Sequence, residues 1–174
     1  MKRLFSLFAL TLVAAASINA SAQSLVGKWE TSGDAQAERL KTMNGNINES
    51  ISTMSFSDNG TYIKYVYIDA TADANGVEMN MVVEIIEAGS WGVKGSELTL
   101  TAKLVDVSKY DISYSKPELN EMVKDMKSQL QQTMEYAIGQ PIIFNIEFSG
   151  NDKVNLKSQN KYLPKEYTLT RTQQ

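Results

Sequence analysis

The sequence of 174 residues contains no histidine and no cysteine. Without these two residue types there is no Ser-His-Asp triad, no Cys-His pair, no thiolate nucleophile and no zinc site built from imidazole or thiolate ligands. Only carboxylates, lysine, tyrosine and Ser-Lys pairs are left as catalytic groups. We therefore expect a protein that is not an enzyme, and the sequence predicts neither a cofactor nor a metal site.

The absence of cysteine also excludes disulfides and the attachment of a lipid through a cysteine. A domain of this kind must be stable through its hydrophobic core alone. The net charge is −3, from 17 basic and 20 acidic residues. Because nucleic-acid binders need a basic face, this mild acidity argues against a nucleic-acid partner. The sequence does not identify a protein partner.

The first residues have the composition of a secretory signal peptide. The basic pair Lys2-Arg3 precedes the largely apolar run Leu4–Ile18, and Ala20-Ser21-Ala22 is a small-residue cleavage pattern. The run is too short for a membrane-spanning helix, although a retained anchor is the alternative. We predict that 1–22 is removed, and that 23–174 is one domain, exported to the periplasm or the extracellular space, not lipid-anchored and without a membrane span.

Two short stretches with the pattern Gly-x-Trp begin runs in which apolar and polar residues alternate. They are Leu25–Glu30 and Gly89–Val93. A period of two indicates a strand with one buried face. A hairpin is predicted from Ile51–Ser57 and Thr61–Asp69, because Asn59-Gly60 between them tolerates the positive φ of a tight turn.

Alternation continues through most of the remaining chain, in segments 77–87, 98–104, 105–114, 142–148, 154–156 and 167–171. Nine or ten short strands joined mostly by tight turns predict a mainly β fold, an antiparallel barrel or sandwich. The polar segment 32–50 is interpreted as a long connection across one barrel mouth. A short helix is expected within it, over 34–41.

One long amphipathic helix is predicted over about 116–138, before the last three strands. Ser115-Lys116-Pro117-Glu118 is a capping box with proline in the first turn, and Gly139 followed by Pro141 ends the helix. Apolar residues recur between these ends at helical spacing. The helix is therefore expected to bury one apolar stripe.

In order along the chain, Leu25–Glu30, Phe56–Tyr62, Gly89–Trp91 and Leu98–Leu100 resemble the secreted lipocalin-like domains of Bacteroidetes-type bacteria, which belong to the calycin group. The resemblance covers most of the chain after residue 22. It implies an antiparallel lipocalin-like β-barrel of about eight to ten strands with the helix inserted.

The resemblance also implies a structural role for two residues. In calycins a tryptophan of the first strand closes the base of the barrel, and a basic residue of the last strand lies over it. Trp29 and Arg171 match these positions. Stacking of a guanidinium on an indole contributes about 0.5–2 kcal/mol. We interpret this pair as a structural seal of the barrel, with no part in catalysis.

A lipocalin-like barrel implies binding of a small hydrophobic or amphipathic ligand in the barrel or at its mouth. Inward-facing residues of the predicted strands would line the pocket, with unbranched methionine side chains adapting to the ligand. These candidates are Tyr62, Val66, Met79, Met81, Val83, Leu100, Phe144 and Ile146. Segment 32–50 would move over the mouth during capture or release.

Two other readings of the sequence stay open. The barrel core is solid in the first, and the protein acts through its surface as an envelope interaction or inhibitor protein. In the second the protein is an enzyme that uses carboxylates such as Glu78 and Glu84.

Overall fold

The computed structural model describes residues 25–32, 45–160 and 166–172. The predicted signal peptide over 1–22 and the predicted short helix over 34–41 lie outside these residues.

Eight antiparallel strands form a closed barrel in chain order, with the last strand paired to the first. They are β1 (Gly27–Ser32), β2 (Gly45–Phe56), β3 (Thr61–Ala74), β4 (Val77–Lys94), β5 (Glu97–Tyr114), β6 (Pro141–Phe148), β7 (Lys153–Ser158) and β8 (Glu166–Arg171). The predicted antiparallel barrel with a helical insertion before the last three strands is confirmed.

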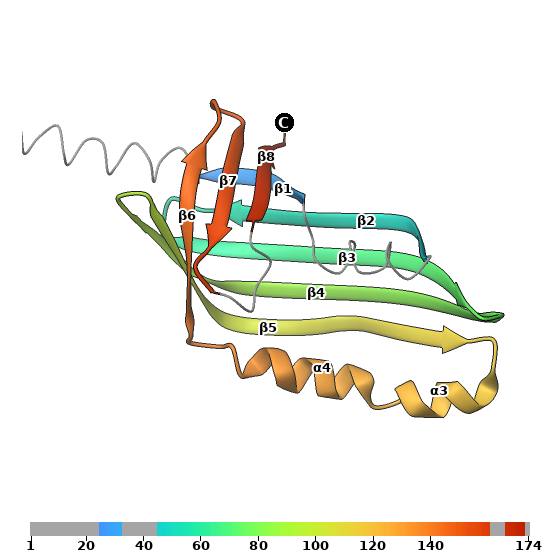
Figure 1. The fold of residues 1–174 in the computed structure, drawn as a ribbon. Helices are drawn as coiled ribbons and strands as arrows, with labels where there is room; N and C mark the ends of the chain where they lie inside the picture. The colour runs from blue at the N-terminus through green and yellow to red at the C-terminus, as the bar shows by residue number, and fades with distance from the viewer. Residues whose placement is uncertain (1–24, 33–44, 161–165, 173–174) are drawn as a thin grey trace, which may run out of the picture.

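The strands differ greatly in length, and this difference shapes the molecule. β2 to β5 have 12 to 18 residues, whereas β1, β6, β7 and β8 have six to eight. The short strands therefore close the barrel at one end only, and the long strands continue beyond it as an open four-stranded sheet (Figure 1). β5 pairs with β6 only from Glu97 to Thr101.

Fewer and longer strands are present than the nine or ten expected. Segments 77–87 and 91–93 belong to one strand, β4, and 97–114 is likewise one strand. The ladder between β4 and β5 shifts register at Glu84/Ile86 and again at Ala88/Gly89. Both bulges place an extra residue in β5, so the alternation of inward and outward residues changes phase within β5 although the strand continues.

The connection predicted over 32–50 is also different in the structure. From Gly45 onward it is strand, because Gly45 to Ser50 pair with β3 as the first half of β2. Residues 45–50 are therefore held by a ladder of backbone hydrogen bonds and do not form a mobile connection. The remainder of the predicted connection, 33–44, lies outside the described residues.

The helical insertion consists of two helices that follow one another along the sheet, α3 (Pro117–Val123) and α4 (Met126–Glu135). They are separated at Asp125, whose φ of −97° and ψ of 0° depart from helical geometry. No residue of either helix is buried, and Met122 is 75% exposed. The expected apolar stripe is only half-buried, at Leu119, Val123, Leu130 and Met134, because the helices lie along one edge strand, β5.

Amide side chains of the two helices cover the edge of β5 that has no neighbouring strand. The Asn120 amide accepts a hydrogen bond from the Tyr114 N–H at 2.7 Å and donates one to the carbonyl of the same residue at 3.2 Å. Gln131 accepts from the Val107 N–H at 2.7 Å and donates to the Val105 carbonyl at 2.9 Å. Each side-chain amide thus replaces one peptide group of a missing strand, and this protects the edge from pairing with another chain.

Trp29 lies in the barrel core and is fully buried, with its indole N–H donating to the Leu25 carbonyl at 2.7 Å. Arg171 pairs with it across the ladder between β1 and β8 and places its Cζ 4.1 Å from the ring centroid. The Arg171 Nη1 donates to the Val26 carbonyl at 2.9 Å. Gly27 has φ of +128°, and a Cβ there would lie 2.7 Å from that nitrogen, so a side chain at this position would strain the backbone and displace the guanidinium.

Replacing Gln131 by methionine tests the role of the edge amides. Gln131→Met keeps the length of the side chain but leaves one N–H and one C=O of β5 without partners. We expect a loss of about 1–2 kcal/mol in the free energy of unfolding and faster hydrogen exchange of the Val107 amide. Gln129→Met on the exposed face of α4 is the control and should change neither quantity. Unchanged exchange in Gln131→Met would show that the amide does not hold the edge.

Arg171→Lys tests the seal over Trp29. A lysine keeps the charge but cannot stack a planar guanidinium on the indole, so unfolding in urea should show a loss of about 1–2 kcal/mol. A double-mutant cycle with Trp29→Phe separates the contact between the two side chains from the loss of either one. A coupling energy of zero would contradict the stacking contribution.

Candidate ligand-binding cavity

A cavity of about 260 Å³ lies inside the closed part of the barrel. Its apolar wall comes from β5 to β8 and from the end of the helical insertion, and includes Leu100, Ala102, Phe144, Leu156 and Leu169. Thr31 lines the cavity, and Trp29 is the preceding residue on the same face of β1. Trp29 therefore lies directly beneath the cavity. The barrel core is therefore solid at its base and hollow above it.

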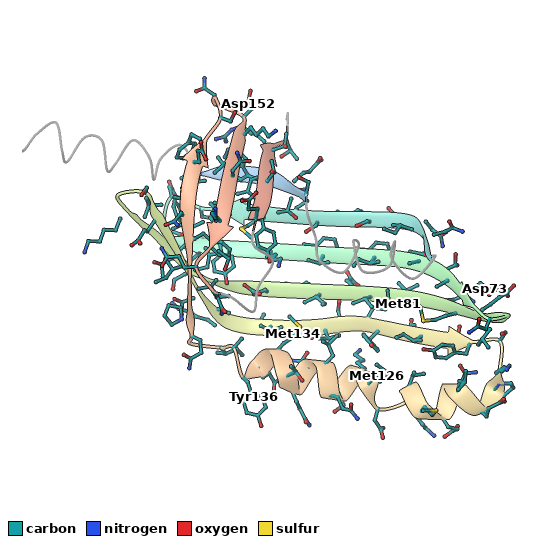
Figure 2. The ribbon with its side chains drawn as sticks, viewed as in Figure 1. Asp73, Met81, Met126, Met134, Tyr136 and Asp152 are labelled. Carbon is teal, nitrogen blue, oxygen red and sulfur yellow. The ribbon has the colours of Figure 1, made fainter. Side chains whose placement is uncertain are left out.

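A second cavity of about 230 Å³ lies between α4 and the inner face of β3 and β4. Val66, Ile68, Val83 and Ile85 form the sheet side, and Leu130 of α4 lies opposite them. Three residues, Lys64, Glu87 and Met134, line both cavities. Figure 2 shows Met134 on the end of α4 that is nearer the closed barrel. The two cavities are therefore neighbours with a shared wall.

Apart from Tyr167 of β8, the polar side chains of the first cavity come from four adjacent strands, β1 to β4. Lys64 and Glu87 are opposite each other in the ladder between β3 and β4. The hydroxyl of Thr31 donates to the hydroxyl of Ser52 in the same wall. One side of the cavity is thus polar and the opposite side is apolar, an arrangement suited to an amphipathic molecule.

The phenol of Tyr62 donates a hydrogen bond to the Glu87 carboxylate from inside the barrel. Tyr62 is almost fully buried. Burial raises the pKa of Tyr62 well above its ordinary value, and the negative charge of Glu87 and the hydrogen bond to it act in the same direction. The phenol therefore remains a donor to Glu87, and one oxygen of that carboxylate is already occupied.

The structure distributes the predicted ligand-binding residues over several places. Leu100 and Phe144 line the first cavity, and Val66 and Val83 line the second. Tyr62 belongs to the barrel core and reaches the cavity wall through Glu87.

Three further candidates line neither cavity. Met81 packs in the core of the open sheet together with Met79, and Figure 2 shows Met81 towards the end of the sheet that is remote from the barrel. Ile146 packs against the barrel core from β6. Alternation predicted correctly that these residues face inward, but it cannot tell how far along a strand the hollow extends.

Lys64 and Glu87 were not predicted, although the same alternation indicates both. Lys64 lies between Tyr62 and Val66 on the inner face of β3, and Glu87 follows Met81, Val83 and Ile85 on the inner face of β4. A charged residue at an inward position within an apolar series is the signal that identifies them.

The carboxylates considered for catalysis lie elsewhere. Glu78 is exposed near the start of β4, and Glu84 accepts a hydrogen bond from the Tyr65 phenol at 3.1 Å. They are six positions apart along β4, about 20 Å, and neither lines the two cavities described above. Among the described residues no group of histidine, cysteine, aspartate or glutamate could hold a metal ion. No helix in the described ranges is long and apolar enough to cross a membrane.

No protein-family model matches the chain, and no curated protein shows significant similarity to it.

Tyr62→Phe tests the coupling between Tyr62 and Glu87 through pH. The folded protein retains the phenol proton that the unfolded chain loses above about pH 10, so the free energy of unfolding should fall as pH rises through that value. Urea unfolding between about pH 8 and pH 11 should show a shallower fall in Tyr62→Phe than in the wild type. Burial also raises the pKa of Tyr110, so part of the fall remains.

The control for this experiment is Tyr136→Phe, because Tyr136 is 85% exposed. That variant should follow the wild-type pH dependence. Identical slopes in Tyr62→Phe and wild type would contradict the retained proton.

Proposed function

We propose that this protein is a non-enzymatic, lipocalin-like binding protein that holds a small hydrophobic or amphipathic molecule inside the barrel. The observation that carries the proposal is the pair of neighbouring cavities, about 260 and 230 Å³, within an otherwise packed sheet. Ligand sites commonly have about 300–1,000 Å³, mostly apolar walls and a few placed polar groups. Taken together, the two cavities fall in this range.

The position of the cavities supports the same proposal. Small eight-stranded barrels either fill their interior with side chains or keep room for one small ligand. Here Trp29, Tyr62 and Leu98 are almost fully buried in the packed core, whereas the small side chain of Ala102 lines the cavity and leaves space. A core that is packed below and hollow above is the arrangement expected of a binding protein. Export from the cytoplasm, expected from residues 1–22, is part of the proposal.

One observation favours action through the surface. Ile63 and Leu104 lie on the outer face of the sheet on either side of Ala88 in the register, and they are 54% and 53% exposed. Exposed apolar residues side by side on a sheet are typical of a protein interaction surface. This second function does not need the cavities, so filling them would leave it intact.

Filling the first cavity tests the proposed function. Decanol serves as a neutral amphipathic probe, and binding to the folded state at about ten times the dissociation constant should raise the unfolding midpoint by about 3 °C. Ala102→Leu places extra methyl groups into the cavity and should abolish the shift. Ala88→Leu, the same change on the outer face of β4, is the matched control and should keep it.

The outcomes are distinct. A wild-type protein that decanol does not stabilise would contradict the proposal. An equal shift in Ala102→Leu and Ala88→Leu would show that the probe binds outside the barrel.

A further inference from the structure

Lys64 has an unusual position for a lysine. It lies on the inner face of β3, opposite Met54 of β2 and Glu87 of β4 in the register, and it lines both cavities. Its ammonium group makes no hydrogen bond or ion pair with any of the described residues, in contrast to Lys127, which donates to the Ser108 carbonyl at 2.9 Å. On its other side Lys64 borders the mainly apolar second cavity, where an ammonium group loses hydration, so an anionic partner would be stabilising there.

Glu87 does not fulfil this role. It is the nearest carboxylate in the register, but it accepts the hydrogen bond of Tyr62 and forms no ion pair with Lys64. The three donors of the Lys64 ammonium group therefore remain free to bind a ligand. The charge of Glu87 in the same wall disfavours a second negative charge, so a ligand with one negative charge fits better than a dianion.

The surroundings of Lys64 supply hydroxyl groups on one side and an apolar surface on the other. The hydroxyls of Thr31 and Ser52 lie in the same cavity wall, and Ser52 is opposite Val66, the next inward residue of β3. Across the first cavity stand Phe144 and Leu156 of β6 and β7. A head group at Lys64 would thus have polar neighbours, while its chain would extend over apolar side chains.

We infer that the ligand is a monoanionic amphiphile, a carboxylic acid with an aliphatic tail, whose head group binds the ammonium group of Lys64 between the two cavities. The tail lies in one of the two apolar cavities that meet there. This inference rests on the proposed binding function and adds the chemical class of the ligand and the residue that selects it.

The experiment compares decanoate with decanol at neutral pH by calorimetric titration of the protein expressed as the full chain. The two probes have the same tail and differ in the head group. A charge-assisted hydrogen bond to Lys64 should make decanoate bind about tenfold more tightly than decanol. Lys64→Met should reduce this ratio to about one while decanol binding remains. Lys103→Met, the same change at an exposed position of β5, should retain the wild-type ratio.

A second variant keeps the test valid if Lys64→Met does not fold, which circular dichroism would reveal. Glu87→Gln preserves an acceptor for Tyr62 and removes the negative charge beside Lys64. It should strengthen decanoate binding several-fold and leave decanol binding unchanged.

The outcomes separate this inference from the proposed function. Equal affinity of the wild type for both probes, or an unchanged ratio in folded Lys64→Met, would overturn the role of Lys64 but keep the cavity as a binding site. An unchanged decanoate affinity in Glu87→Gln would also count against the head group lying there. Failure of both probes to bind the wild type would overturn the proposed function and this inference with it.

Discussion

β5 pairs with β4 along its whole length, but on its other edge the backbone groups beyond Thr101 have no strand beside them, because β6 pairs only with Glu97–Thr101. This constraint follows from joining four long strands to four short ones in a single closed barrel. The open part of the sheet needs a cover along that edge, and α3 and α4 provide it through the amides of Asn120 and Gln131. The helices are therefore held by polar contacts to an edge, and none of their side chains is buried.

The same arrangement creates the cavities. A helix that lies along a strand edge reaches the inner face of the sheet only with the side chains that point that way, here Leu130 and Met134. These two side chains bound the space under α4 without filling it. Met134 also borders the barrel cavity, so the position of α4 limits both hollows. The placement of α4 along the edge of β5 thus both protects that edge and bounds the candidate binding site.

Charge inside this hollow needs a physical reason, because an unpaired ion in an apolar wall is unfavourable. The carboxylate of Glu87 has the Tyr62 phenol as a donor, and burial keeps that phenol protonated. Lys64 has no comparable partner among the described residues. Glu87 is therefore part of a structural hydrogen bond, whereas Lys64 remains available to bind a ligand.

Much of the fold could be read from the residues. Alternation separated the buried Tyr62, Val66 and Ile68 from the outward Ile63, and Asn59-Gly60 located the first hairpin correctly. The full length of β5 could not be read, because two bulges shift which of its residues face inward while the strand continues. The alternation also placed Lys64 and Glu87 on the inner face, but two inward charges can be assigned to a binding site only once a cavity beside them is known.

The sequence by itself determined the strand type, the inward faces, the helical insertion and the exclusion of histidine and cysteine chemistry, since these depend on residue identity and local spacing. The tertiary structure alone decided which strands are too short to complete the barrel, where α4 lies, and therefore where space remains beside Lys64. Local pattern cannot specify such space, because a cavity is defined by the distances between elements that are far apart in the chain.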